Sequence, residues 1–441
     1  MFPSPHDALP LPPRPNLEHY KKRAKDLVKA CHSSNPAAIR DWAARGIDSL
    51  VRLSDLKIIP QLPVRLDHWT DQLEKFARDK LSGTCTLAAA QFVIARAHGF
   101  ESWPQLASHL AAIDRDNSPV NHFELAADAI ITGDIAALEK LLNQNPGLIR
   151  AQSTRRHHAT LLHYISANGV EGYRQKTPSN IVTIADLLLQ SGADVNVSVD
   201  IYGGSTTLDL VATSLHPERA GVQDALMRLL LDHGAKVDPP NRPAGRILTA
   251  CLANGRFHAA EFLAQHGAKL NVEAAAGLGR LDEVKTFFDE NNNNENGNLK
   301  ASATRAQMER ALLWSCEYGQ DAVARFLIER GVPLEAQADT GQTALHWAVI
   351  GGHLDSIEFL LERGAPLEAR NSYDATPLGQ ALWSALHADG RIDYFPVIET
   401  LLKAGAKIEA ATLAWLSQQE PTASSLTERI AAILKRHARS D

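Results

Sequence analysis

Three polar stretches carry side chains whose types could bind a ligand or polarise a substrate. Two are insertions, residues 168–180 (NGVEGYRQKTPSN) and 213–223 (TSLHPERAGVQ), and the third is the glycine-containing segment 200–207, DIYGGSTT. Together they supply phenol, guanidinium, amide, imidazole and hydroxyl groups, on Tyr173, Arg174, Gln175, Tyr202, Thr206, Thr207, His216 and Gln223. In a pocket built from the two insertions, the polarising groups would be Tyr173, Arg174 and His216, marked by perturbed ionisation. The alternative is that the insertions pack on each other as a structural brace.

Other charged and sulfur-containing residues give weaker signals for chemistry. The run Arg155-Arg156-His157-His158 could contact an anion, but we expect it on an exposed finger. His158 and His163 are five residues apart, which is poor spacing for two metal ligands on one helical turn. The four cysteines, Cys31, Cys85, Cys251 and Cys316, are far apart in the chain. This spacing predicts neither a zinc site nor a disulfide framework but buried or incidental thiols in a reducing compartment.

Motifs of well-known enzyme classes are missing from the sequence. It contains no Walker A loop, HExxH, GxSxG or glycine fingerprint following a strand. We therefore assign no catalytic residue, no metal and no cofactor, and the sequence does not predict an enzyme.

The elements that must position these side chains recur along the chain. A Leu-rich amphipathic run ends in Gly-Ala, or once Gly-Val, at Gly192, Gly234, Gly267, Gly331, Gly364 and Gly405. The separations are 42, 33, 64, 33 and 41 residues, so two of them equal 33 and one is close to twice that value. Each run predicts a helix that ends at a left-handed C-cap, where glycine avoids the steric cost of a Cβ atom. A turn or finger follows each cap.

The clearest unit is DTGQTALHWAVIGGHLDSIEFLLERGAPLEARN, residues 339–371, which resembles the ankyrin consensus nearly throughout. Thr343-Ala344-Leu345-His346 stands where that family has Thr-Pro-Leu-His. The resemblance implies that Thr343 caps the first helix of the unit and that His346 bonds to neighbouring turn backbone. It predicts an all-α ankyrin-repeat solenoid of helix–turn–helix units with hairpin fingers.

The N-terminal part lacks this spacing and is predicted to be helical. NLEHYKKRAKDL begins at Asn16 as N-cap, and two later helices meet at Gly99, the second capped by Ser102. The motifs LEHYKKRAKDL and AQFVIARAHGFESWPQL resemble a helical module that precedes ankyrin repeats in bacterial proteins of uncharacterised function. The predicted organisation is a Pro-rich disordered lead (1–16), a helical module (17–113), about eight repeats (121–410) with insertions at 168–180, 213–223 and 384–395, and capping helices (411–441).

Composition narrows the function classes. The net charge of −6 argues against nucleic-acid binding, which needs a basic surface. No apolar run is long enough to span a bilayer, and the N-terminus lacks the pattern of a secretory signal, so we expect a cytoplasmic monomer.

The leading hypothesis is a scaffold that binds a protein partner through the concave face of the repeats, the paired insertions, or both. Tryptophans 314, 347 and 383 lie in the first helices of the last three repeats, and Trp347 is a candidate anchor unless it fills the groove between units. The alternatives are a small-molecule or catalytic pocket between residues 168–180 and 213–223, and a secreted bacterial effector.

Overall fold

The chain folds into helices grouped in two compact units. The computed structural model describes residues 7–12, 15–53, 62–115, 117–240, 242–288, 303–387, 391–417 and 424–437. Within these residues the regular secondary structure is helical, apart from three isolated β-bridges, which confirms the all-α prediction. The units are Met1–Val237 and Asp238–Asp441, and each has an apolar core. Their boundary falls inside the segment 121–410.

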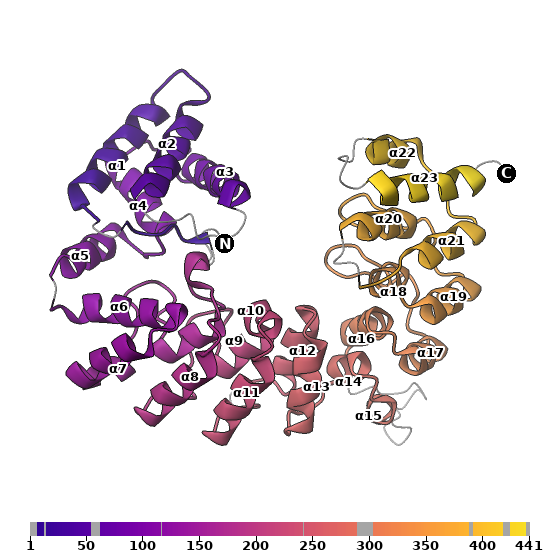
Figure 1. Cartoon of the computed structure of the whole chain (residues 1–441). Coiled ribbons are helices and arrows are strands. Elements are labelled where there is room, and N and C mark those ends of the chain that lie inside the picture. The colour runs from indigo at the N-terminus through magenta and orange to yellow at the C-terminus, as the bar shows by residue number, and fades with distance from the viewer. Residues whose placement is uncertain are drawn as a thin grey trace, which may run out of the picture. The chain divides into compact units, whose positions relative to one another are not determined.

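The first unit begins with a bundle of helices. Its members are α1 (Leu17–Cys31), α2 (Ala38–Leu53), α3 (Leu62–Leu81), α4 (Leu87–Ala97) and α5 (Trp103–Ile113). Helices α1 and α3 each pack against α2 and α4, and the core between them includes Leu27, Leu73 and Val93 (Figure 1). The predicted caps are confirmed: Asn16 accepts a hydrogen bond from the Glu18 amide, and Ser102 caps α5.

The structure describes residues 7–12 of the lead that was predicted to be disordered (1–16), and for these residues the prediction is wrong. The side chains of Ala8 and Leu9 are buried. The Leu9 amide donates to the carbonyl of Ala97 at 2.8 Å, and its own carbonyl lies 3.1 Å from the His98 ring. The apolar side chains of this segment are therefore buried against the end of α4, which removes them from water. Residues 1–6 and 13–14 lie outside the described residues.

Stacked helix pairs follow the bundle in the first unit. They are α6 (Pro119–Thr132) with α7 (Ile135–Gln144), η4 (Leu161–Ser166) with α8 (Ile181–Gln190), and α9 (Thr207–Thr213) with α11 (Gln223–Asp232). Shorter helices join them: η3 (Pro146–Arg150), η5 (Gly172–Arg174) and α10 (Leu215–Arg219). The 3-10 helix η4 packs against α6 on one side and α9 on the other. The insertion 168–180 therefore lies between η4 and α8, and the insertion 213–223 lies between α9 and α11, the two helices of the next pair.

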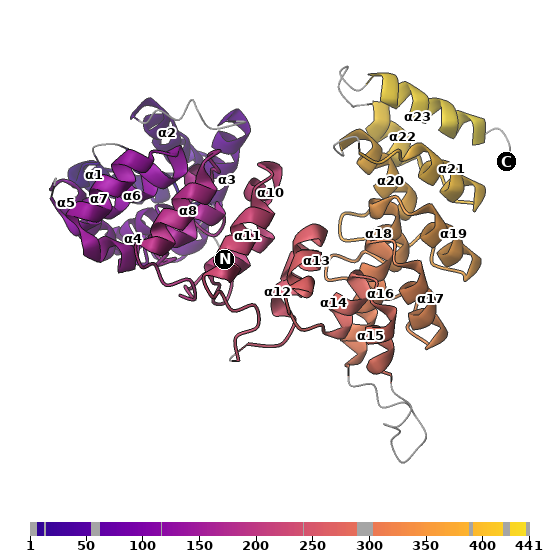
Figure 2. The ribbon, with the colours of Figure 1, turned by 60° about the horizontal axis from the view of Figure 1, so that its bottom comes forward.

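The second unit repeats this arrangement. Its helices are α12 (Arg246–Ala253), α13 (Phe257–Gln265), α14 (Val272–Gly277), α15 (Leu281–Thr286), α16 (Arg305–Glu317), α17 (Asp321–Glu329), α18 (Ala344–Gly351), α19 (Leu354–Glu362), α20 (Pro377–His387), α21 (Phe395–Lys403), α22 (Ala410–Ser417) and α23 (Ser424–His437). The first helices α14, α16, α18 and α20 pack one on the next, and α17, α19 and α21 form a second row (Figures 1 and 2). Each pair thus covers an apolar side of its neighbour, as solenoid stability requires.

The punctuation of the helices matches the sequence analysis. All six glycines that end Leu-rich runs have positive φ, between 80° and 94°. At Gly364 the glycine amide bonds to the carbonyl of Leu361, and the Ala365 amide to that of Leu360. Thr343 caps α18, and the His346 Nε2 lies 3.0 Å from the carbonyl of Ala375 in the next finger, as expected. Among the described residues, no helix has the length and apolar character needed to cross a membrane.

Candidate functional site

The first insertion brings charged side chains into the interior of the first unit. The side chain of Glu171 is only 1% exposed and pairs with the guanidinium of Arg155, which is equally buried. The Nε2 of His157 lies 3.3 Å from a Glu171 carboxylate oxygen. A second carboxylate, that of Glu124 on α6, lies 3.1 Å from Arg155 on the other side.

Arg174, one of the candidate ligand-binding residues, extends the same network. Its guanidinium lies 2.8 Å from Glu124 and 2.8 Å from Asp128, which are one helical turn apart on α6. Its side chain is 4% exposed. We call Glu124, Asp128, Arg155, His157, Glu171 and Arg174 the ion network.

The pKa values of Glu124, Glu171 and Arg174 keep these three groups charged near neutral pH. Burial alone would raise the pKa of Glu124, but Arg155 and Arg174 lower it to about 2. The pKa of Glu171 is likewise raised by burial and lowered more strongly by Arg155, to well below its ordinary value. Burial lowers the pKa of Arg174, but Glu124 and its other anionic neighbours raise it well above the usual range. Carboxylates that paired arginines keep ionised are poor general acids at neutral pH.

The network connects three parts of the first unit. Arg155 donates to the carbonyl of His98 at 3.2 Å, which ties the finger to the N-terminal bundle. The ring of Tyr173 packs against the core of that bundle, and the Arg174 guanidinium lies 5.6 Å from the ring centroid. The Gln175 amide donates to the Val170 carbonyl within the insertion. These contacts are those of a brace between the bundle, α6 and the insertion.

The finger that carries Arg155 differs from the expectation of an exposed loop. Arg155 and His157 are buried, because the Arg155 guanidinium and the His157 ring both face the Glu171 carboxylate. Arg156 and His158 alternate with them and are partly exposed. Sequence reasoning missed Glu124, Asp128 and Glu171, although the acidic residues within FELAADAII, on an otherwise apolar helix, were a signal that could have found the first two.

The second insertion and the segment before it use their polar groups locally. The Gln223 amide donates to the carbonyls of Val211, Ala212 and Ser214, which closes the insertion on the end of α9. Thr206 caps α9 in a capping box, and Thr207 is completely buried.

The two insertions meet through Asn168 rather than through the predicted polarising groups. The Asn168 side-chain amide donates to the Thr213 hydroxyl at 3.0 Å. The exposed Tyr202 places its hydroxyl 3.4 Å from the same side chain. His216 lies at the start of α10. Tyr173 and Arg174 are instead directed to the N-terminal bundle and α6.

The second unit presents its aromatic side chains differently along the stack. Trp314 on α16 is buried, and Trp347 on α18 is partly buried against the core. Its indole N–H has no hydrogen-bond partner among the described residues. Trp383 on α20 is 51% exposed and stacks on His387 at 4.8 Å between ring centroids. The ring of His387 lies 6.2 Å from that of Trp415 on α22. We call Trp383, His387 and Trp415 the aromatic row.

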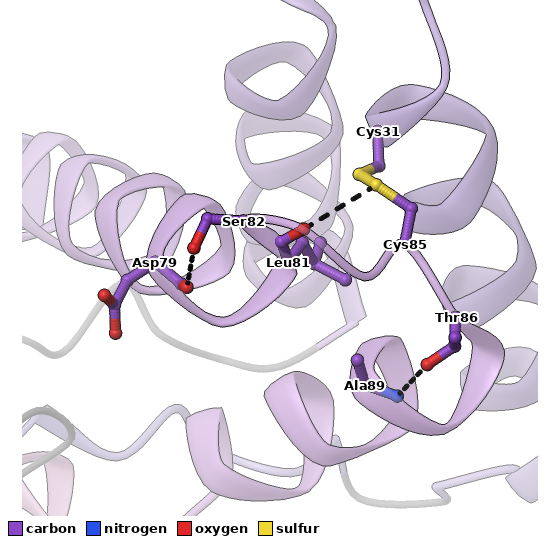
Figure 3. The surroundings of a disulfide bond; sticks show 7 residues. All are labelled: Cys31, Asp79, Leu81, Ser82, Cys85, Thr86 and Ala89. Atoms are coloured by element: carbon purple, nitrogen blue, oxygen red, sulfur yellow. Dashed lines mark hydrogen bonds between the residues drawn. A yellow bond between two sulfur atoms is a disulfide. The ribbon is translucent and has the colours of Figure 1, made fainter.

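The cysteines require a correction. Cys31 at the end of α1 and Cys85 before α4 form a disulfide, with their Cα atoms 6.1 Å apart (Figure 3). The fold brings together two residues separated by 54 positions, which spacing in the sequence cannot reveal. Cys251 and Cys316 are buried free thiols, as expected. Because disulfides are usual in oxidising compartments, the cysteines no longer support a reducing one.

Comparison with known proteins places the family resemblance in the second unit. The family model for ankyrin repeats in three copies matches residues 272–371 and, in a second alignment, 312–412. These residues include the unit 339–371 and the helix pairs from α14 to α21. No curated protein matches the chain. In the part of the chain that the structure describes, no three metal-ligating side chains gather in one place.

Proposed function

We propose that the chain is a scaffold that binds a protein partner, and that the partner contacts the first-helix side of the second unit. Ankyrin repeats are general protein–protein interaction modules, and the matched repeats lie in that unit. The observation that carries the proposal is the aromatic row on α20 and α22. Trp383 is the exposed tryptophan of the row, whereas Trp415 is partly buried against the core. Exposed apolar side chains at one place are typical of interaction sites, and tryptophan is enriched among residues that dominate binding energy.

Further exposed side chains support this location. Tyr373, in the finger before α20, is 76% exposed, and Leu413 on α22 is 47% exposed. A protein segment with apolar anchor side chains would cover them, with its own backbone paired to the polar finger residues. The proposal involves no nucleic acid, membrane or cofactor, and one copy of the chain suffices.

The paired insertions are the weaker candidate for the contact. The side chains of Arg174 and Gln223 are engaged within the first unit, and breaking a buried ion pair to reach a ligand would cost several kcal/mol, about 3–5. A structural role for the insertions therefore has more support than a small-molecule or catalytic pocket. The first insertion braces the bundle and α6, however, and contacts the second insertion mainly through Asn168, so it is not the mutual packing of the two insertions that was expected. The secreted-effector alternative shares the scaffold, and the Cys31–Cys85 disulfide is the feature that favours it over a cytoplasmic protein.

The test compares three substitutions in affinity capture from native cells, read by quantitative mass spectrometry. Trp383→Ala is expected to reduce recovery of a specific partner at least tenfold without lowering the melting temperature, because Trp383 is half exposed. Leu125→Ala is the matched control, since Leu125 in the first unit is 48% exposed. Trp347→Ala is expected to lower the melting temperature. Retention of every captured protein by Trp383→Ala would contradict the proposed surface.

A further inference from the structure

A hollow of about 710 Å³ opens between the N-terminal bundle and the finger of Arg155 and Arg156. Its walls come from α3, α4, Glu101 in the turn after α4, and the finger, and all lie within the first unit. Six of the lining residues are cationic or aromatic: Lys75, Phe76, Lys80, Phe92, Arg96 and Arg156. A volume of this size is that of a small-molecule site.

Two arginines face the hollow from different elements. Arg96 is on α4 within the apolar sequence AQFVIARAHGF, and it is 8% exposed. Arg156 is held in place by its backbone amide, which donates to the Gly99 carbonyl at 2.9 Å. Among the described residues, neither guanidinium has a carboxylate within ion-pair distance, although Lys80 pairs with Asp79 on the rim at 2.8 Å. Glu101, an exposed carboxylate that also lines the hollow, acts on Arg96 from a distance and raises its pKa slightly against the effect of burial.

The lack of a carboxylate partner for Arg96 and Arg156 among the described residues contrasts with the ion network a few residues away. Arg155, next to Arg156 in the chain, is fully buried and matched by two carboxylates. Burial and the neighbouring charge of Arg156 both lower the pKa of Arg96, so the two cations repel each other across a partly desolvated space. Two guanidinium groups in this arrangement offer their N–H donors to a carboxylate or phosphate, which can accept two parallel hydrogen bonds from each.

The remaining wall is aromatic. Phe92 is 38% exposed, unusual for a phenylalanine on a helix that packs in a core. Its ring lies 6.5 Å from that of Phe76 and is tilted from it by 40°. The Lys80 ammonium lies 5.8 Å from the Phe76 ring centroid. A flat apolar group entering the hollow would cover Phe92 and remove that surface from water.

We propose that this hollow binds a small organic anion, whose phosphate or carboxylate group lies between Arg96 and Arg156 and whose flat apolar body packs on Phe92. The site is separate from the protein-binding surface proposed on the second unit. Four cationic and two acidic side chains line the hollow, although the whole chain has a net charge of −6. The positive charge is therefore local to the hollow. The partial enclosure and small volume favour a small molecule over a polymer.

Isothermal titration calorimetry on the full chain with 1-naphthyl phosphate as probe tests the proposal. We expect one binding site, at least tenfold weaker binding of inorganic phosphate, and at least tenfold weaker binding of 1-naphthol. The first comparison measures the contribution of the aromatic wall and the second that of the arginines. A parallel titration with 1-naphthoate tells a carboxylate ligand from a phosphate ligand, and binding of either supports the site.

Substitutions then locate the binding. Arg156→Gln is expected to weaken binding of the probe at least tenfold. The melting temperature should stay unchanged, because the Arg156 side chain is partly exposed and makes no ion pair with the described residues. Phe92→Ala is expected to weaken binding of naphthyl phosphate several-fold and to leave binding of inorganic phosphate unaffected. Arg150→Gln, at an exposed arginine of the same unit, is the control. Failure of both naphthyl anions to bind at millimolar concentration, or equal binding by wild type, Arg156→Gln and Phe92→Ala, would overturn the proposal.

Discussion

The buried charges of the ion network are tolerated because opposite charges face them, and they belong to Glu124, Arg155, Glu171 and Arg174. Asp128, at the edge of the network, is 54% exposed. Burying an isolated carboxylate or guanidinium is strongly unfavourable, so the buried members are stable only as a set. Glu124 contacts both Arg155 and Arg174, and Glu171 contacts Arg155 and His157. At this scale the network acts as a unit, and removal of one member exposes the desolvation cost of its partners.

The first prediction follows from this coupling. Arg155→Met keeps most of the side-chain volume but leaves Glu171 and Glu124 with too little positive charge. We expect the free energy of unfolding of the first unit to fall by about 3–5 kcal/mol. Urea denaturation followed by circular dichroism measures it. Arg150→Gln, at an exposed position, is the control and is expected to change stability by less than about 0.5 kcal/mol. A loss below about 1 kcal/mol for Arg155→Met would contradict the network's role.

The second prediction concerns acid. The folded-state pKa values of Glu124, about 2, and Glu171 are below their unfolded values near 4.5. The unfolded chain therefore takes up protons first as pH falls, and the stability that these carboxylates contribute, complete above pH 4.5, is lost as pH approaches 2. Urea midpoints between about pH 6 and pH 3 should fall in the wild type. The urea midpoint should fall less steeply with decreasing pH in Glu171→Gln, because one of the titrating groups is missing. An unchanged dependence of the midpoint on pH would contradict this account.

At the scale of the element, a helix ends where its local sequence allows it to end. The left-handed position after α19 is occupied by Gly364, with φ at 80° and open space on the side where a Cβ atom would lie. Gly379, by contrast, lies inside α20 without positive φ, and a Cβ there would make only ordinary contacts, at 3.6 Å and 3.7 Å. Replacement of glycine by alanine is therefore favourable at Gly379 and unfavourable at Gly364.

The third prediction uses this matched pair. Gly364→Ala is expected to lower the free energy of unfolding of the second unit by about 1–2 kcal/mol, because alanine is strained at positive φ. Gly379→Ala is expected to raise it by up to about 1 kcal/mol, because alanine loses less backbone entropy in a helix. Thermal denaturation of the two variants beside wild type distinguishes them, and a change of equal sign in both would show that φ is not the deciding factor.

These helix ends also explain how much of the structure was predictable from sequence. The caps at Asn16, Ser102 and Thr343 depend on hydrogen bonds within three residues, so a single sequence reveals them. The contacts of the candidate site connect residues far apart in the chain. Arg155 pairs with Glu124, 31 positions earlier, and Arg174 with Asp128, 46 positions earlier. An Arg–His run on a finger is the same in sequence whether it faces water or a buried carboxylate, and only tertiary packing decides.

At the scale of the whole molecule, two cores are stabilised by different means. The disulfide and the ion network both belong to the first unit. The second unit depends on helix pairs packed around an apolar core that extends from α14 to α23. In a stack of this kind, stability is a sum of repeat and nearest-neighbour contributions, so a perturbation is expected to remain near its origin.

The last prediction tests that locality by reducing the disulfide. Closing a loop of 54 residues restricts the unfolded chain by about 4 kcal/mol in the chain-entropy model, so reduction should destabilise the bundle of α1 to α4 by up to that amount. Hydrogen–deuterium exchange with and without dithiothreitol measures it, with peptides from α18 to α21 as the internal control. Cys31→Ser should match the reduced wild type and should not respond to dithiothreitol. Protection lost equally in both units would mean that the chain unfolds as one cooperative body. Loss confined to the first unit would show that the second unit stays folded under reducing conditions.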